Sequence, residues 1–107
     1  MSQVQTQVTM EQVANMVVLT AGDNVGIAVR DIAANETARA TEGGGIAAIE
    51  AIPQGHKIAL APVAAGDAII RFSVPVGIAT AAIPTGALVH IHNVRSRYLD
   101  NVEDHYE

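Results

Sequence analysis

The 107-residue chain has the length of one domain, and its eleven acidic and six basic residues give a formal net charge of −5. This balance excludes a nucleic-acid backbone as the partner, and the lack of cysteine excludes a disulfide framework, a thiolate zinc site and a cysteine nucleophile. No segment approaches the ~18 apolar residues of a membrane span. The N-terminus lacks the basic and apolar regions of a secretory signal, so the sequence predicts a cytoplasmic protein with no membrane partner.

The two ends of the chain differ in composition from the middle. Residues 1–15 are polar and rich in glutamine, and residues 98–107 are strongly charged, so we interpret them as a flexible N-terminal arm and C-terminal tail. A short helix from Met10 to Met16 is the alternative for the arm. Residues 16–97 combine β-branched and small side chains with frequent glycine, proline and asparagine, which is typical of short strands. The sequence predicts an all-β domain over 16–97. Its core must be aliphatic, because the chain has no tryptophan and three other aromatic residues. So thin a core is a hint of a homo-oligomer or another partner.

One pattern occurs three times along this middle region. The segments are GIAVRDIAANE (26–36), KIALAPVAAGD (57–67) and GIATAAIPTGA (77–87). Each has Ile-Ala, three residues, Ile or Val, two residues, and then Asn35, Gly66 or Gly86. We expect a strand that enters a tight turn, a branched residue that fills the core, and a left-handed backbone at the last position. The unequal spacing excludes a solenoid and favours one compact fold that uses a similar turn three times.

Between the first two units, Glu42-Gly43-Gly44-Gly45 predicts the tip of a hairpin. Its strands are expected at Ala38–Thr41 and Ile46–Ile52. A glycine-rich phosphate cradle is the alternative, but the helix start and the Lys-Ser/Thr of such a loop are missing.

Two histidines stand close together in the segment VHIHN, residues 89–93. A strand over Leu88–His92 would place His90 and His92 on one face, roughly 6.5 Å apart. The two imidazoles could then converge on one ion or one ligand. A His-x-His pair is an incomplete metal site, so another element or another chain would have to supply the remaining ligands. The alternative is that both histidines are solvated on the polar face of an edge strand.

A second polar segment, Gly55-His56-Lys57, lies in a turn at the start of the second unit. A lysine presented by such a turn could hold an anionic substrate, because its ammonium group is a mobile point charge with three donors. A solvated turn is the alternative. Asn93 can donate and accept hydrogen bonds at once, which suits the hydroxyl groups of a sugar acid, or it can cap the strand.

Taken together, these residues resemble the SAF-type domain of the altronate and galactarate dehydratases, which also occurs as the small subunit of sulfolactate sulfo-lyases. The resemblance rests on GDNVGIAVRDI, GHKIALAPVAAGDAIIRF, VPVGIATAAIPTG and VHIHN, and it covers about Val17 to Arg97. It implies a β-clip fold of short strands and hairpins. The family commonly has Tyr-Gly where this chain has Phe72-Ser73, so the substrate is not carried over from any one relative.

The resemblance implies a lyase subunit that is inactive alone. It would be the free-standing small subunit, or the separately expressed domain, of a two-component hydroxy-acid dehydratase or sulfo-lyase whose active site is completed by a large subunit. A divalent metal such as iron(II) would be held mainly by that subunit. The alternative is a non-catalytic module for sugar-acid binding or assembly, since a fold alone does not fix a function. The implied catalytic residues are His90 and His92, which are also the possible metal ligands, and the implied substrate-binding residues are Gly55, His56, Lys57 and Asn93.

Overall fold

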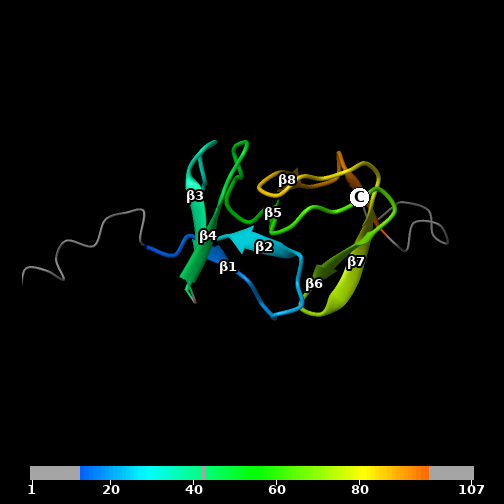
Figure 1. The fold of residues 1–107 in the computed structure, drawn as a ribbon, viewed down its shortest axis with the longest axis horizontal. Coiled ribbons are helices and arrows are strands. Elements are labelled where there is room, and N and C mark those ends of the chain that lie inside the picture. The colour runs from blue at the N-terminus through cyan, green and yellow to red at the C-terminus, as the bar shows by residue number, and fades with distance from the viewer. Residues whose placement is uncertain (1–12, 42, 97–107) are drawn as a thin grey trace, which may run out of the picture.

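The computed structural model describes residues 13–41 and 43–96, and the part of the chain that it describes is built from nine short strands without a helix (Figure 1). The all-β, β-clip class expected of a SAF-type domain is therefore confirmed. No described segment forms a helix of the length and apolarity that a membrane crossing needs. The strands are β1 (Met16–Val17), β2 (Val25–Ala28), β3 (Thr37–Ala40), β4 (Gly43–Ala47), β5 (Lys57–Ala59), β6 (Ala68–Arg71), β7 (Val74–Ala79), β8 (Leu88–Val89) and β9 (Val94–Arg95).

The strands form three small antiparallel sheets. The largest has the order β1-β2-β5-β8, the second is the hairpin β3-β4, and the third has the order β6-β7-β9. In Figure 1 the four-stranded sheet lies in the middle, with β3 and β4 at one end of the molecule and β6 and β7 at the other. Each hairpin therefore stands beside the central sheet, and strands far apart in the sequence become neighbours.

The repeated turn predicted from the sequence is confirmed at all three positions. Asn35, Gly66 and Gly86 have φ angles of 73°, 92° and 88°. The branched residues expected to fill the core, Ile32, Val63 and Ile83, are almost fully buried. The alanines of the three Ile-Ala pairs, Ala28, Ala59 and Ala79, are buried as well. The turns therefore deliver one branched side chain and one alanine each into the interior.

A fourth unit of the same kind was not predicted. It runs from Ala47 to Gly55, with Ala48 and Ile52 fully buried and Gly55 at a φ of 84°. The predicted strand over Ile46–Ile52 is wrong, because β4 ends at Ala47 and the chain enters this turn. This unit does not match the sequence pattern, because it begins with Ala47-Ala48 where the other three begin with Ile-Ala.

The four units pair two by two. Ile32 forms an isolated antiparallel bridge with Ile52, and Val63 forms the equivalent bridge with Ile83. Each pair has its own core, so the interior consists of two hydrophobic clusters that meet at the central sheet. The second pair follows the first at an offset of 31 residues, the separation of Ile32 and Val63 in the sequence.

The same offset relates the two hairpins. The pair Thr37↔Ala47 in the first has its counterpart in Ala68↔Ile78 in the second, and both contain a bulge. The predicted first hairpin is thus confirmed, although its second strand already begins at Gly43.

Two asparagine side chains, of which Asn15 is buried and Asn24 is half-buried, hold these hairpins in the same way. The Asn15 carboxamide accepts from Arg39 N at 2.7 Å and donates to Thr37 O at 2.9 Å. The Asn24 carboxamide accepts from Ile70 N at 2.7 Å and donates to Ala68 O at 3.0 Å. Asn15 belongs to the predicted arm, yet it is 2% exposed and fixes β3 to the body of the domain. Residues 1–12 of that arm and the tail 98–107 lie outside the described residues.

Candidate functional site

The segment VHIHN does not continue β8. The strand ends at Val89, and residues 90–93 form a turn that leads into β9. Asn93 closes the turn: its Oδ1 accepts from His90 N at 2.9 Å and its Nδ2 donates to Leu88 O at 2.8 Å. An asparagine side chain that bonds to nearby backbone groups competes with a strand ladder, so the predicted strand over Leu88–His92 is wrong. Both polar groups of Asn93 are used within its own turn.

The turn that contains Gly55 places His56 and Lys57. Gly55 has the left-handed backbone that glycine adopts without a steric cost, and its N–H donates to Ala28 O at 2.8 Å. Gly55 therefore has a conformational role in the fourth unit. Lys57 begins β5 and pairs with Val89 of β8, so the GHK turn and the VHIHN turn lie next to each other.

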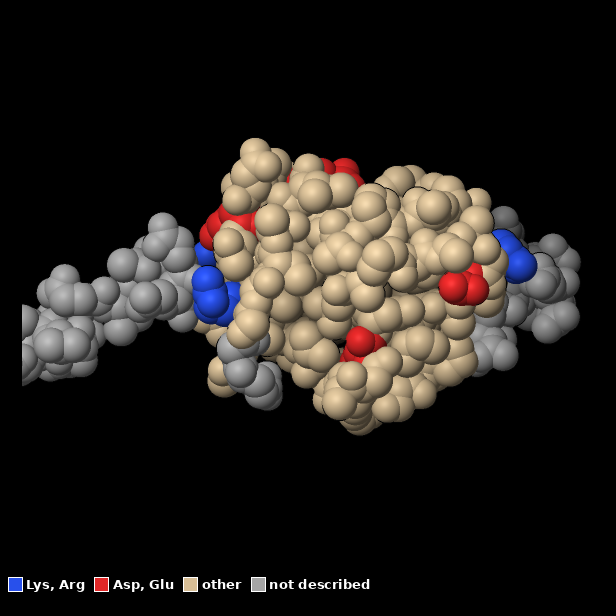
Figure 2. Space-filling model, viewed as in Figure 1, with Lys and Arg blue, Asp and Glu red and all other residues tan. Residues whose placement is uncertain are grey.

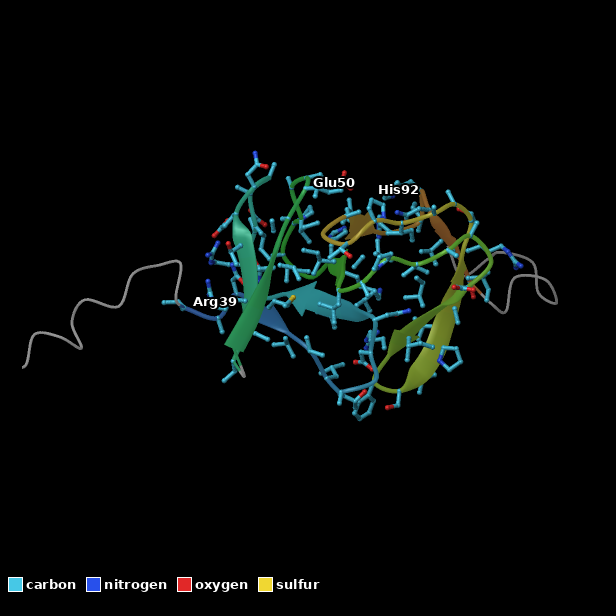
Figure 3. All side chains as sticks on the ribbon, viewed as in Figure 1. Arg39, Glu50 and His92 are labelled. Carbon is cyan, nitrogen blue, oxygen red and sulfur yellow. The ribbon has the colours of Figure 1, made fainter. Side chains whose placement is uncertain are left out.

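The histidine pair in the structure differs from the one expected. The rings of His56 and His90 lie 4.5 Å apart between centroids, at an interplanar angle of 58°. His90 and His92 do not share a strand face, because both lie in the turn that follows β8. His92 is exposed, and in Figure 3 it lies along the same edge of the molecule as Glu50, whose Oε2 accepts from Leu88 N at 2.9 Å. The contact between β5 and β8, and not the short sequence spacing, brings two imidazoles together.

The surroundings of His90 favour its neutral form. Partial desolvation lowers the pKa of its imidazole below the usual value, and the nearby charges of His56, Lys57 and His92 lower it further. Desolvation also lowers the pKa of Lys57, with a contribution from Arg71. A neutral imidazole beside an ammonium group can accept a proton while the ammonium binds an anion.

A pocket of about 440 Å³ opens beside these residues. Its charged or titratable lining consists of Lys57 from β5, Arg71 from β6, His90 from the turn and Arg95 from β9, and none of the described lining residues is acidic. We call it the cationic pocket. Arg71 and Arg95 were missed by the sequence reasoning, since neither belongs to a motif and only the pairing of strands places them here. On the face shown in Figure 2, the described basic side chains lie near the two ends of the molecule.

The described residues do not assemble a metal site by themselves. No three histidine, aspartate, glutamate or cysteine side chains among residues 13–41 and 43–96 lie close enough together to hold one ion. The pair of His56 and His90 falls short of the three protein ligands that even an open catalytic zinc site uses. That His90 and His92 are possible metal ligands therefore stays a prediction, and it needs further ligands from another chain.

Comparison with known proteins agrees with this architecture. The chain matches the family described as "Altronate/galactarate dehydratase SAF domain" over residues 14–97. It is 37% identical over 78 residues to the altronate dehydratase of Bacillus subtilis (strain 168), and the aligned segment covers 73% of this chain and 16% of that protein. It is 42% identical over 67 residues to the galactarate dehydratase (L-threo-forming) of Escherichia coli (strain K12), and the aligned segment covers 63% of this chain and 12% of that protein.

A further relative is itself a subunit. The (2R)-sulfolactate sulfo-lyase subunit alpha of Chromohalobacter salexigens is 40% identical over 48 residues, which are 45% of this chain and 51% of that subunit. The chain thus spans less than a fifth of the two dehydratases and about half of the sulfo-lyase subunit. With the family match over most of its length, the chain belongs to the SAF domain family of the altronate and galactarate dehydratases.

Proposed function

We propose that this chain is the small subunit of a two-component hydroxy-acid dehydratase or sulfo-lyase and contributes polar residues to an active site that a large subunit completes. The observation that carries the proposal is the meeting of His56, Lys57 and His90 beside the cationic pocket. The family relationship supports the class of reaction, because the relatives are named as dehydratases and a sulfo-lyase subunit. The cytoplasm is the proposed location.

The reaction would be an elimination next to a carboxylate. A base takes the proton from the carbon beside the carboxylate, and the electron pair of that C–H bond forms the double bond as the neighbouring C–O or C–S bond breaks. The leaving group departs as water after protonation, or as sulfite. We assign the proton-accepting role to His90, whose neutral form is favoured. Lys57 would bind the substrate carboxylate.

The other predicted residues take different parts in this proposal. His92 lies in the same exposed turn as His90, where it would face the large subunit and protonate the leaving group. His56 supports the ring of His90 and contacts the substrate. Gly55 and Asn93 act through the turns that they close. A divalent metal, iron(II) by resemblance, would belong to the large subunit, and no step is assigned to it here.

The test is reconstitution. The chain is purified with a large dehydratase-like subunit from the same source, and turnover of sugar acids and sulfolactate is measured. We expect His90→Gln to lower kcat by about 100-fold, the usual contribution of a general base, with a smaller change in KM. Arg39→Gln, at the far end of the molecule from His92 (Figure 3), is the matched surface control and should keep full activity.

Two results would contradict parts of the proposal. Full activity of His90→Gln would remove the histidine from the chemistry and favour the alternative of a non-catalytic binding or assembly module. Full activity of His92→Ala would show that His92 takes no part. If no large partner is found and no acid is turned over, the proposal of a lyase subunit fails.

A further inference from the structure

Half of the chain's basic residues lie around one pocket. The sequence has six Lys and Arg against eleven Asp and Glu, yet Lys57, Arg71 and Arg95 all line the cationic pocket. They come from three different strands, so the concentration is produced by the fold and not by a local run of charge. Such a gathering in an acidic protein creates a local positive potential that attracts anions.

The arrangement has an electrostatic cost in the unliganded domain. Lys57 is half-buried, and the charge of Arg71 helps to lower the pKa of its ammonium group. The charges of Lys57 and the exposed Arg71 repel each other, and an anion placed between them removes the repulsion. The pocket is therefore better suited to a charged ligand than to none.

The positions of the cations indicate more than one anionic group. Arg71 pairs with Val74 at one end of β7, and Arg95 pairs with Ile78 further along the same strand. Their partners Val74 and Ile78 are four residues, or roughly 13 Å, apart along β7, and the two arginines lie on opposite sides of that strand. One carboxylate is saturated by one arginine fork with one further donor, so cations on three separate strands exceed what a single carboxylate uses.

The volume and the remaining walls fit a small polar acid. At about 440 Å³ the pocket is within the usual range for small-molecule sites. Val76 and Val89 supply apolar walls, and the His90 ring supplies a group that can donate to or accept from a hydroxyl.

We propose that the cationic pocket selects hydroxy acids with two anionic groups, a dicarboxylate or a carboxylate with a sulfonate, over monocarboxylates. Arg71 with Lys57 binds one anionic group and Arg95 binds the other. The chemical class of ligand rests on the proposed function, whereas the preference for two charges rests on the pocket.

The experiment compares two six-carbon sugar acids on the full 107-residue chain by isothermal titration calorimetry at fixed salt. Galactarate carries two carboxylates and gluconate carries one. We expect galactarate to bind at least about tenfold more tightly, the effect of one additional charge-assisted contact. In Arg95→Gln the advantage of galactarate should shrink to about twofold or less, because Arg95 binds the second anionic group, and Arg39→Gln should leave it unchanged. A thermal melt of each variant checks that it is folded.

Equal affinity for the two acids, no detectable binding of either, or an undiminished preference in Arg95→Gln would overturn the inference. Lys57→Gln is a second test variant and should weaken the binding of both acids, because one anionic group of each acid contacts Lys57. The two proposals can fail separately. Selective diacid binding without turnover in the reconstituted enzyme would refute the lyase function alone, and equal turnover of mono- and diacids would refute the charge selectivity alone.

Discussion

The two halves of the domain share a scaffold but differ at two positions that decide whether a pocket forms. In the first half, Gly26 and Ala40 lie in the interior, and the Met16 side chain packs directly against Gly26, where an added Cβ would lie 2.6 Å from Met16 Sδ. At the offset of 31 residues the second half has Lys57 in place of Gly26 and Arg71 in place of Ala40. One half is closed by a methionine, and the other opens into the cationic pocket.

The difference separates the residues that build the fold from those that give it chemistry. The buried branched residues and the left-handed turn positions are repeated in both halves, so they serve the shared scaffold. Lys57 and Arg71 are not repeated, and neither is the histidine pair. In the proposed function, the chemistry would thus depend on departures from the repeat.

The largest effect is expected at a glycine whose surroundings differ between the halves. Gly55 and Gly86 are equivalent, with φ angles of 84° and 88°, but a Cβ at Gly86 would lie 2.1 Å from Ala47 O, whereas one at Gly55 meets nothing within 4 Å. Gly55→Ala should cost about 1–2 kcal/mol in the free energy of unfolding, the penalty of the left-handed backbone. Gly86→Ala should cost at least about 3 kcal/mol, because the backbone must also shift.

Urea denaturation of both variants measures this difference. Gly86 O accepts from Ile49 N at 3.0 Å, so Gly86 forms part of the joint between the halves. Gly66→Ala is the control, since Gly66 has a φ of 92° and open space around it, and it should match Gly55→Ala. Equal losses of unfolding free energy at Gly55 and Gly86 would mean that the backbone around Gly86 can shift to admit a Cβ without a further cost.

A smaller and symmetric effect is expected at the two asparagines. Asn15→Ala and Asn24→Ala each leave one strand N–H and one strand C=O without a partner, in the hairpins β3-β4 and β6-β7 respectively. We expect each to lower the free energy of unfolding by about 1–3 kcal/mol and the two losses to agree within about 1 kcal/mol. Thermal and urea unfolding of both variants tests this expectation. A loss confined to one of them would show that the halves are similar in pattern and unequal in energy.

The sequence predicted the scaffold better than the site. The Ile-Ala turn could be found because its physical requirements are local: a branched side chain for the core and a residue that tolerates positive φ. The fourth unit was missed because it begins Ala47-Ala48. Its spacing of 20 residues from the first unit equals that between the units at Ile58 and Ile78, and this equality was a signal that could have revealed it.

The site required contacts that no local pattern contains. His90 meets His56 only because β5 pairs with β8, and Arg71 reaches the same pocket from a hairpin. His90 and His92 do not share the predicted strand face because the Asn93 side chain bonds to the backbone of its own turn. Register and tertiary pairing, which depend on the whole chain, decided the composition of the site.

The smallest expected effect concerns the tip of the second hairpin, where this chain has Phe72-Ser73. Both residues have positive φ angles, 57° and 63°, which glycine or asparagine adopt more easily. Asp23 holds this tip by accepting from Phe72 N and Ser73 N, each at 2.9 Å. Burial alone would raise the pKa of Asp23, but these bonds and those from Thr20 keep it well below its usual value.

Ser73→Gly should therefore raise the free energy of unfolding by about 0.5 kcal/mol. The relief of the left-handed strain, about 1–2 kcal/mol, is partly offset by the greater freedom of glycine in the unfolded chain. The variant also loses the 3.0 Å contact between the Ser73 and Thr20 hydroxyls, which is exposed and contributes little. Ser73→Ala isolates that loss, since it removes the hydroxyl and keeps the Cβ, and it should be neutral or slightly destabilising. If Ser73→Gly shifts the urea midpoint no further upward than Ser73→Ala, the bonds to Asp23 offset the whole energetic cost of the positive φ at Ser73. The second hairpin would then tolerate side chains at its tip through one carboxylate.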